Sequence, residues 1–257
     1  MENGHETLFK LPREWQERIE VIDLKDTKEY PIAIETVLKL IKGKPVEICN
    51  AHGKVSCMIC KREERDTEAS HSDLFVDLEL NALEPDTIVI FDSLTQLTAS
   101  AINNITKAQP DDYKMQTDDW GYLSKLIEVF AVTIQQARYN RVVISHEIEA
   151  ETEGKKRTLV PVAGSRNSSR NISKAFDHVV YCERKNKKHV FSSSTTDATN
   201  ILAGSRTDAV VGAGDKPSLL QIFKPELYSS AKPAPASTIK PANSQATDLL
   251  NRLKHKT

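Results

Sequence analysis

Two short apolar runs, separated by a long amphipathic segment, most restrict the fold of this chain. The first run, residues 87–91, ends at Asp92, and the second, residues 142–144, ends at Ser145. Runs that are apolar on both faces are typical of strands buried in a parallel sheet. Between the runs, apolar residues recur every three or four positions over residues 120–137, which predicts a helix. Strand, helix and strand together predict a right-handed crossover and an α/β fold.

Three further segments have strand-like patterns. Residues 18–24 alternate between apolar and polar side chains. Residues 178–182 and 189–191 flank a charged turn and predict a hairpin, in which Cys182 is expected to be a buried apolar residue. Residues 218–223 predict a last strand.

The composition divides the chain into a core, an insertion and a tail. Residues 1–228 are expected to form one α/β core, with a small Cys/His insertion at residues 45–65. Residues 229–257 begin with a Pro/Ala/Ser stretch that cannot bury enough apolar surface to become ordered. A short helix is expected near residues 246–256, where it either docks on a protein partner or frays.

The net charge of −1 gives no overall attraction to nucleic acid or membranes, so any DNA contact must come from local basic residues. The sequence contains no long apolar run of membrane-spanning length and begins without a secretion signal, so a cytoplasmic protein is expected. In that reducing compartment the four cysteines are better candidates for metal or structural roles than for disulfides.

A C-x2-H-x4-C-x2-C pattern contains three of these cysteines. It predicts Cys49, His52, Cys57 and Cys60 as the ligands of a zinc knuckle, with Gly53 at positive φ in the turn. Four protein ligands leave no open position, so the expected Zn²⁺ is structural. The alternative is a chance grouping of reduced side chains.

Asp92 lies where parallel sheets bind their ligands, at the carboxyl end of a strand. An apolar strand that ends in Asp is typical of a Walker B segment, whose carboxylate organises Mg²⁺ around ATP phosphates. Alternatively, Asp92 caps the helix that begins near Leu94. His146 follows the next strand and is either a sensor of the γ-phosphate or a solvent-exposed histidine.

Four segments occur in an order that carries a family resemblance: residues 87–93, 142–147, 162–167 and 172–181. On these segments, residues 1–225 resemble phage-encoded RecA-like ATPases of the AAA family, relatives of recombinases that act on single-stranded DNA. The resemblance implies a RecA-like three-layer core with a mainly parallel sheet. It also implies ATP and Mg²⁺ as cofactors, single-stranded DNA as a partner and a homo-oligomeric ring or filament.

The resemblance also implies roles for individual residues. Glu2 matches the position that activates the attacking water, Asp92 and Ser93 would bind the magnesium nucleotide, and His146 would be the sensor. Basic residues expected to reach the nucleotide of a neighbouring subunit are Arg184, Lys185 and Arg206. Residues expected to contact DNA from a flexible loop at 164–171 are Arg166, Asn167 and Arg170. The alternatives are a solvated hairpin tip, and Asn171 as the cap of a helix from Ile172.

The sequence departs from this family at the phosphate-binding loop, because it contains no Gly-x-x-x-x-Gly-Lys-Ser/Thr. We therefore expect poor or absent nucleotide affinity, and the hypothesis is a shortened form whose P-loop and first strand lie upstream. The alternative is a non-catalytic, zinc-containing DNA-binding or assembly subunit. A third class is an AAA-type protein that acts on virion assembly or another protein partner.

Overall fold

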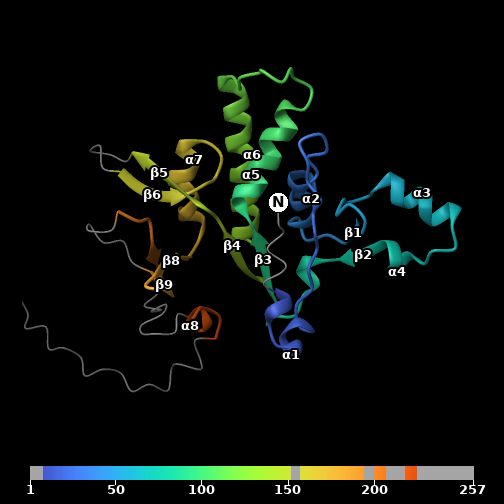
Figure 1. The fold of residues 1–257 in the computed structure, drawn as a ribbon, viewed down its shortest axis with the longest axis horizontal. Coiled ribbons are helices and arrows are strands. Elements are labelled where there is room, and N and C mark those ends of the chain that lie inside the picture. Colours follow the sequence, from blue (N-terminus) through green and yellow to red (C-terminus); the bar gives the residue numbers. More distant parts are fainter. Residues whose placement is uncertain (1–7, 152–156, 194–199, 207–217, 225–257) are drawn as a thin grey trace, which may run out of the picture. The chain divides into compact units, whose positions relative to one another are not determined.

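The computed structural model describes residues 8–151, 157–193, 200–206 and 218–224 and divides into two compact units, Met1–Pro217 and Ser218–Thr257 (Figure 1). The helices of the first unit are α1 Arg13–Gln16, α2 Ala33–Leu40, α3 Met58–Asp66, α4 His71–Leu74, η2 Leu80–Ala82, α5 Leu94–Thr106, α6 Thr117–Gln135, α7 Arg166–Asn171 and η4 Ile172–Ala175. Its strands are β1 Val46–Cys49, β2 Phe75–Leu78, β3 Ile88–Asp92, β4 Asn140–Ile144, β5 Glu147–Glu151, β6 Arg157–Pro161, β7 His178–Val179, β8 Tyr181–Lys185, β9 Lys188–Ser192 and β10 Gly204–Ser205. The second unit contains α8 Leu220–Phe223. The linker and helix predicted within 229–257 lie outside the described residues.

The predicted strand–helix–strand unit is confirmed at the centre of the first unit. β3 and β4 pair in parallel, from Ile88 opposite Asn140 to Asp92 opposite Ile144. The connection between them contains α5 and α6, and α6 covers residues 120–135 of the apolar period predicted for residues 120–137. The carboxyl ends of both strands therefore lie side by side.

One face of this strand pair is covered by a helical core. Phe91 of β3 and Val143 of β4 pack against buried residues of α2, α5 and α6. Four side chains at helical spacing on α6 are buried in this core: Leu123, Ile127, Phe130 and Ile134. The Phe130 ring meets the Phe91 ring edge-on, with centroids 5.4 Å apart. Helix amphipathicity thus fixes which face of the strand pair is covered.

The opposite face of the strand pair is open. Ile88, Ile90 and Ile144, which we call the open sheet face, are 40%, 59% and 41% exposed. The described strands form one parallel and four antiparallel pairs. The α/β class is therefore confirmed, whereas the mainly parallel sheet and the third layer stay predictions.

The strand predicted for residues 18–24 is wrong, because this segment forms no strand in the described structure. Ile22 and Leu24 pack on the core while Ile19 and Val21 are exposed, so the apolar side chains of this segment are divided between the core and solvent, without a partner strand. Gly53 lies against this segment, since a Cβ there would be 2.3 Å from the carbonyl oxygen of Asp23.

The hairpin is confirmed as β8 and β9, whose turn residues Asn186 and Lys187 have φ of 49° and 65°. Positive φ at both central residues is typical of a tight two-residue hairpin turn. Cys182 lies on β8 but is exposed, so its predicted burial is wrong.

The last strand predicted for residues 218–223 is also wrong, because residues 220–223 form α8. The backbone N–H of Leu220 donates to Ser218 Oγ, 3.1 Å away. Such a local side-chain bond favours a turn over a strand.

The flexible loop predicted at residues 164–171 is instead the helix α7. Ser165 Oγ caps the helix by accepting a hydrogen bond from the Ser168 N–H at 3.2 Å. The buried Ser169 Oγ accepts a second bond from the Ala163 N–H at 3.1 Å. The predicted capping role of Asn171 is wrong, because its side chain makes no cap bond at the start of η4.

No helix in the described part of the chain is long and apolar enough to cross a membrane.

Candidate metal centre and nucleotide-binding rim

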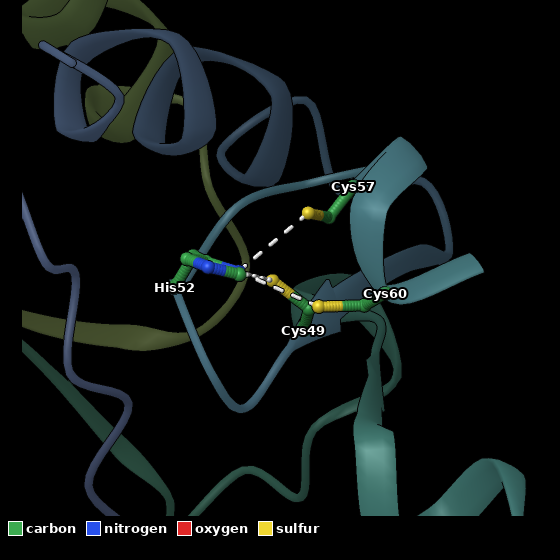
Figure 2. A group of neighbouring side chains, drawn as sticks. All are labelled: Cys49, His52, Cys57 and Cys60. Carbon is green, nitrogen blue, oxygen red and sulfur yellow. Dashed lines mark hydrogen bonds between the residues drawn. The ribbon is translucent and has the colours of Figure 1, made fainter. Parts of the chain in front are cut away.

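Four metal-ligand side chains converge between β1 and α3 (Figure 2). Cys49 is the last residue of β1, and a tight turn at Gly53, with φ of 65°, returns the chain toward it. The Gly53 N–H donates to the Cys49 carbonyl oxygen at 2.8 Å. Cys57 then precedes α3 and Cys60 lies in its first turn. Cys49, His52, Cys57 and Cys60, here called the Cys/His cluster, thus come from one strand end, one turn and one helix start.

The ligand atoms of the Cys/His cluster have the spacing of a tetrahedral site. His52 Nδ1 lies 3.7 Å from the sulfur of Cys49, 3.7 Å from that of Cys57 and 3.4 Å from that of Cys60. Ordinary zinc bond lengths in a tetrahedron separate sulfur and nitrogen by about 3.6 Å. The three cysteines are at most 3% exposed. The four residues therefore fit a metal such as zinc.

The surroundings of Cys57 and Cys60 shift the pKa values of the two thiols in opposite directions. Burial, together with hydrogen bonds from the neighbouring thiols, raises the pKa of Cys60. At Cys57 burial acts in the same direction, but hydrogen bonds from the Cys60 backbone and the neighbouring thiols outweigh it and lower the pKa. Cys57 also precedes the N-terminus of α3, where partial positive charge favours a thiolate. The environment of Cys57 therefore favours its thiolate more than the environment of Cys60 does.

Asp92 lies at the rim of the parallel strand pair, on the same side of the sheet as the open face. The N-cap of α5 is Ser93, whose Oγ accepts a hydrogen bond from the Gln96 N–H at 3.2 Å. The Asp92–Ser93 peptide bond is cis. The Asp92 carboxylate is exposed and makes no hydrogen bond or ion pair within the described residues. The alternative that Asp92 caps this helix is therefore wrong, and its carboxylate is available to a ligand.

Hydrogen bonds of a threonine hydroxyl link the first turn of α5 to the residues that follow β4. Thr95 Oγ1 lies 3.4 Å from Ser145 Oγ and accepts a hydrogen bond from the His146 N–H at 2.9 Å. The His146 side chain is exposed. Sequence reasoning missed Thr95, although a hydroxyl residue in the first turn after the strand-end Asp was the available signal. We call Asp92, Ser93, Thr95, Ser145 and His146 the strand rim.

The structure does not join the other predicted nucleotide residues to the strand rim. Arg184 and Lys185 lie at the end of β8, and no hydrogen bond or ion pair of the described residues connects them to Asp92. The Arg206 guanidinium instead donates to Asp177 Oδ1 at 3.1 Å and to the Lys174 carbonyl oxygen at 2.7 Å. Glu2 lies outside the described residues. Their nucleotide roles stay predictions.

The predicted DNA-contacting residues share one helix. Arg166, Asn167 and Arg170 of α7 are exposed, as is Lys174 of η4. Arg166 and Arg170 are four positions apart, so they lie on the same face of α7. We call Arg166, Arg170 and Lys174 the basic ridge.

Residues 8–207, most of the chain, match a family profile described as "AAA domain". Neither the curated proteins nor the solved structures gave a significant match.

Proposed function

Since this chain belongs to the AAA domain family, we propose that it is an ATP-dependent protein acting on DNA in recombination or replication, in which Asp92 organises the Mg²⁺ of a bound nucleotide. The phage origin and bacterial cytoplasm implied by the sequence resemblance belong to this proposal. The observation that carries it is the strand rim, where an unbonded carboxylate ends a strand of a parallel pair. Ligands of parallel sheets bind at this end.

Three residues of the rim, and Glu2, have a proposed role beside the nucleotide. Asp92 holds the waters of Mg²⁺, as the carboxylate of a Walker B segment does. His146, at the end of the neighbouring strand, senses the γ-phosphate. The Thr95 bridge fixes the start of α5 relative to the end of β4, since Thr95 accepts a hydrogen bond from the His146 backbone. Glu2 is the proposed base that activates the attacking water.

The phosphate cradle is proposed to come from residues outside this sequence. The 257 residues contain no Gly-x-x-x-x-Gly-Lys-Ser/Thr, whose backbone N–H groups and lysine hold the β- and γ-phosphates. The open sheet face supports this proposal, because parallel sheets normally bury both faces. A strand and helix that carry the P-loop would cover Ile88, Ile90 and Ile144 and bring the loop beside Asp92.

The basic ridge is the proposed contact with single-stranded DNA. Arg166, Arg170 and Lys174 follow one another at four-residue intervals along α7 and η4. Guanidinium and ammonium groups at this spacing neutralise backbone phosphates without reading the bases. Arg184 and Lys185 are proposed to face the nucleotide of a neighbouring subunit in a ring or filament.

A non-catalytic, zinc-containing DNA-binding subunit is the second candidate. It is favoured by the contrast between the Cys/His cluster, whose four ligands are all present, and a nucleotide site without a phosphate cradle. In this case DNA binding persists without ATP turnover and is lost when the metal is removed.

The deciding experiment measures Mg²⁺–ATP affinity and turnover, with single-stranded DNA present, for this chain and for a version that carries a phosphate-binding segment before residue 1. We expect binding and turnover only in the extended version, and their loss on Asp92→Asn. Equal affinity of the extended protein and its Asp92→Asn variant would refute the role of Asp92. An extended protein that binds DNA but never hydrolyses ATP would support the second candidate.

A separate measurement tests the DNA contact. Fluorescence anisotropy with a labelled oligo-dT should show weaker binding for the Arg166→Ala/Arg170→Ala double variant at low salt, with a shallower salt dependence. The exposed Arg138 offers a matched control, and Arg138→Ala should bind more tightly than the double variant. Equal affinities of all three proteins would exclude the basic ridge.

A further inference from the structure

A second cluster of metal-ligand groups lies on the antiparallel pair of β1 and β2, here called the ribbon, which also carries part of the Cys/His cluster. The antiparallel register of β1 and β2 sets Glu47 opposite Asp77, two pairs along from Cys49 opposite Phe75. Side chains two residues apart on a strand share a face. Glu47 and Asp77 therefore present two carboxylates beside the Cys/His cluster, on the same side of the ribbon.

His71, the first residue of α4, completes this second group. Its ring stacks on Phe75 with centroids 5.0 Å apart, which orients Nε2 toward both carboxylates. Nε2 lies 3.4 Å from Asp77 Oδ2 and 3.9 Å from Glu47 Oε2. Two ligands of one metal ion lie about 3.0 to 3.4 Å apart at ordinary nitrogen and oxygen bond lengths. A small movement of Glu47 thus brings three ligand atoms around one ion.

The other ring nitrogen of His71, Nδ1, faces a carboxylate, as the second ring nitrogen of a metal-bound histidine commonly does. His71 Nδ1 lies 2.8 Å from Glu64 Oε1, a carboxylate of α3. Metal-ligating histidines commonly donate their other ring N–H to such a group, which leaves the facing nitrogen free to bind. The same contact also suits a protonated imidazole, so the arrangement permits either a metal ion or a proton at this position.

The charges around Glu47 distinguish these alternatives. The Lys61 ammonium forms an ion pair with Glu47 Oε1 at 2.9 Å, which leaves Glu47 Oε2 as the oxygen that faces His71. Glu47, Glu64 and Asp77 carry three negative charges against the single charge of Lys61. A divalent ion balances the remaining charge, whereas one proton on His71 leaves one negative charge unbalanced.

We propose that Glu47, His71 and Asp77 form a second metal site for a first-row divalent cation such as Zn²⁺ or Mn²⁺, with Glu64 as the group that positions His71. Imidazole and carboxylate ligands suit these ions. Asp77 and His71 are partly exposed to solvent, and three protein ligands leave positions for water or an anionic ligand. The site is open, in contrast to the four-ligand Cys/His cluster, and it ties α4 to the ribbon.

Titration of the whole protein with Co²⁺ tests the proposal, because Co²⁺ bound by thiolates has charge-transfer bands that Co²⁺ bound by imidazole and carboxylates lacks. We expect one equivalent with these bands and a second without them. Asp77→Asn should weaken the second equivalent at least about tenfold, and Glu64→Gln by about 10- to 100-fold. Both variants should keep the charge-transfer bands, which shows that the ribbon remains folded.

Glu63→Gln is the matched control, since Glu63 is exposed on α3 and has no side-chain contact with the cluster in the described structure. Its second equivalent should bind as in the unaltered protein. Binding of a single equivalent, or a second equivalent that neither Asp77→Asn nor Glu64→Gln weakens, would overturn the proposal.

Discussion

The Cys/His cluster and the strand rim contrast in how their chemistry is assembled. All four ligand atoms of the cluster come from residues 49–60, at the end of one strand, in one turn and at the start of one helix. The strand rim combines residues from the end of β3, the start of α5 and the segment just after β4, about fifty positions apart, and it lacks a phosphate-binding motif. Residues close together in the sequence thus form a complete set of metal ligands, whereas residues far apart in the sequence form only part of the proposed nucleotide site.

Removal of one cluster ligand should have the largest effect. Cys57→Ser is expected to abolish stoichiometric zinc, because zinc binding in small cysteine/histidine sites contributes about 10 to 16 kcal/mol to folding at neutral pH. Metal analysis of purified protein checks the loss. Hydrogen exchange should increase over residues 46–78 and stay slow in α6, since the cysteine cluster and the helical core share no buried residue.

Cys182→Ser is the control for this prediction, because Cys182 is exposed on β8 and lies outside the cluster. It should retain the metal content of the unaltered protein. Unchanged metal content in Cys57→Ser would show that the four-ligand interpretation is wrong.

A substitution in the helical core should have the next largest effect on stability and should leave the metal content unchanged. Phe130 is fully buried and meets Phe91 edge-on, so Phe130→Ala is expected to lower the free energy of unfolding by about 3 to 5 kcal/mol. Denaturant unfolding followed by tryptophan fluorescence, to which Trp15 and Trp120 contribute, measures it. Val129→Ala, an exposed position on the same helix, should change stability by about 0.5 kcal/mol or less.

The same contrast explains what could be predicted from the sequence. The spacing of apolar residues predicted β3, β4 and α6, and the spacing of cysteines and histidine predicted the metal cluster, because both patterns are local. The position of Asp92 at the end of a parallel strand was also correctly predicted from the point where the apolar run stops.

Features that depend on tertiary contacts were missed. The Thr95–Ser145 bridge joins residues fifty positions apart, and its local signal, a hydroxyl residue in the first turn after Asp92, does not indicate a partner. The alternation in residues 18–24 is real, but a nearby turn at Gly53 and the core, rather than a partner strand, determine which side chains are buried. The helix α7 depends on a cap at Ser165, which the polar composition of its loop-like sequence concealed.

A smaller effect tests which residue of the strand rim stabilises α5. Ser93→Ala is expected to cost about 1 kcal/mol, because it removes the acceptor of the Gln96 N–H. Asp92→Asn should leave the free energy of unfolding nearly unchanged, since the Asp92 carboxylate has no partner among the described residues. Paired urea unfolding curves measure the difference. A cost for Asp92→Asn as large as that for Ser93→Ala would make Asp92 a structural cap and weaken its proposed role at Mg²⁺.

The smallest effect is expected at the open sheet face, and its size should depend on the partner. Ile90 is 59% exposed, so Ile90→Ser should lower the stability of this chain by about 0.5 kcal/mol or less. In the version that carries a phosphate-binding segment, the same change should cost more, because a covered isoleucine contributes about 1.5 to 3 kcal/mol through burial. Unfolding curves of both proteins, each with and without Ile90→Ser, measure this coupling. A cost that is equally small in both proteins would mean that the added segment does not cover β3, and the strand rim would then have to obtain its phosphate cradle from another direction.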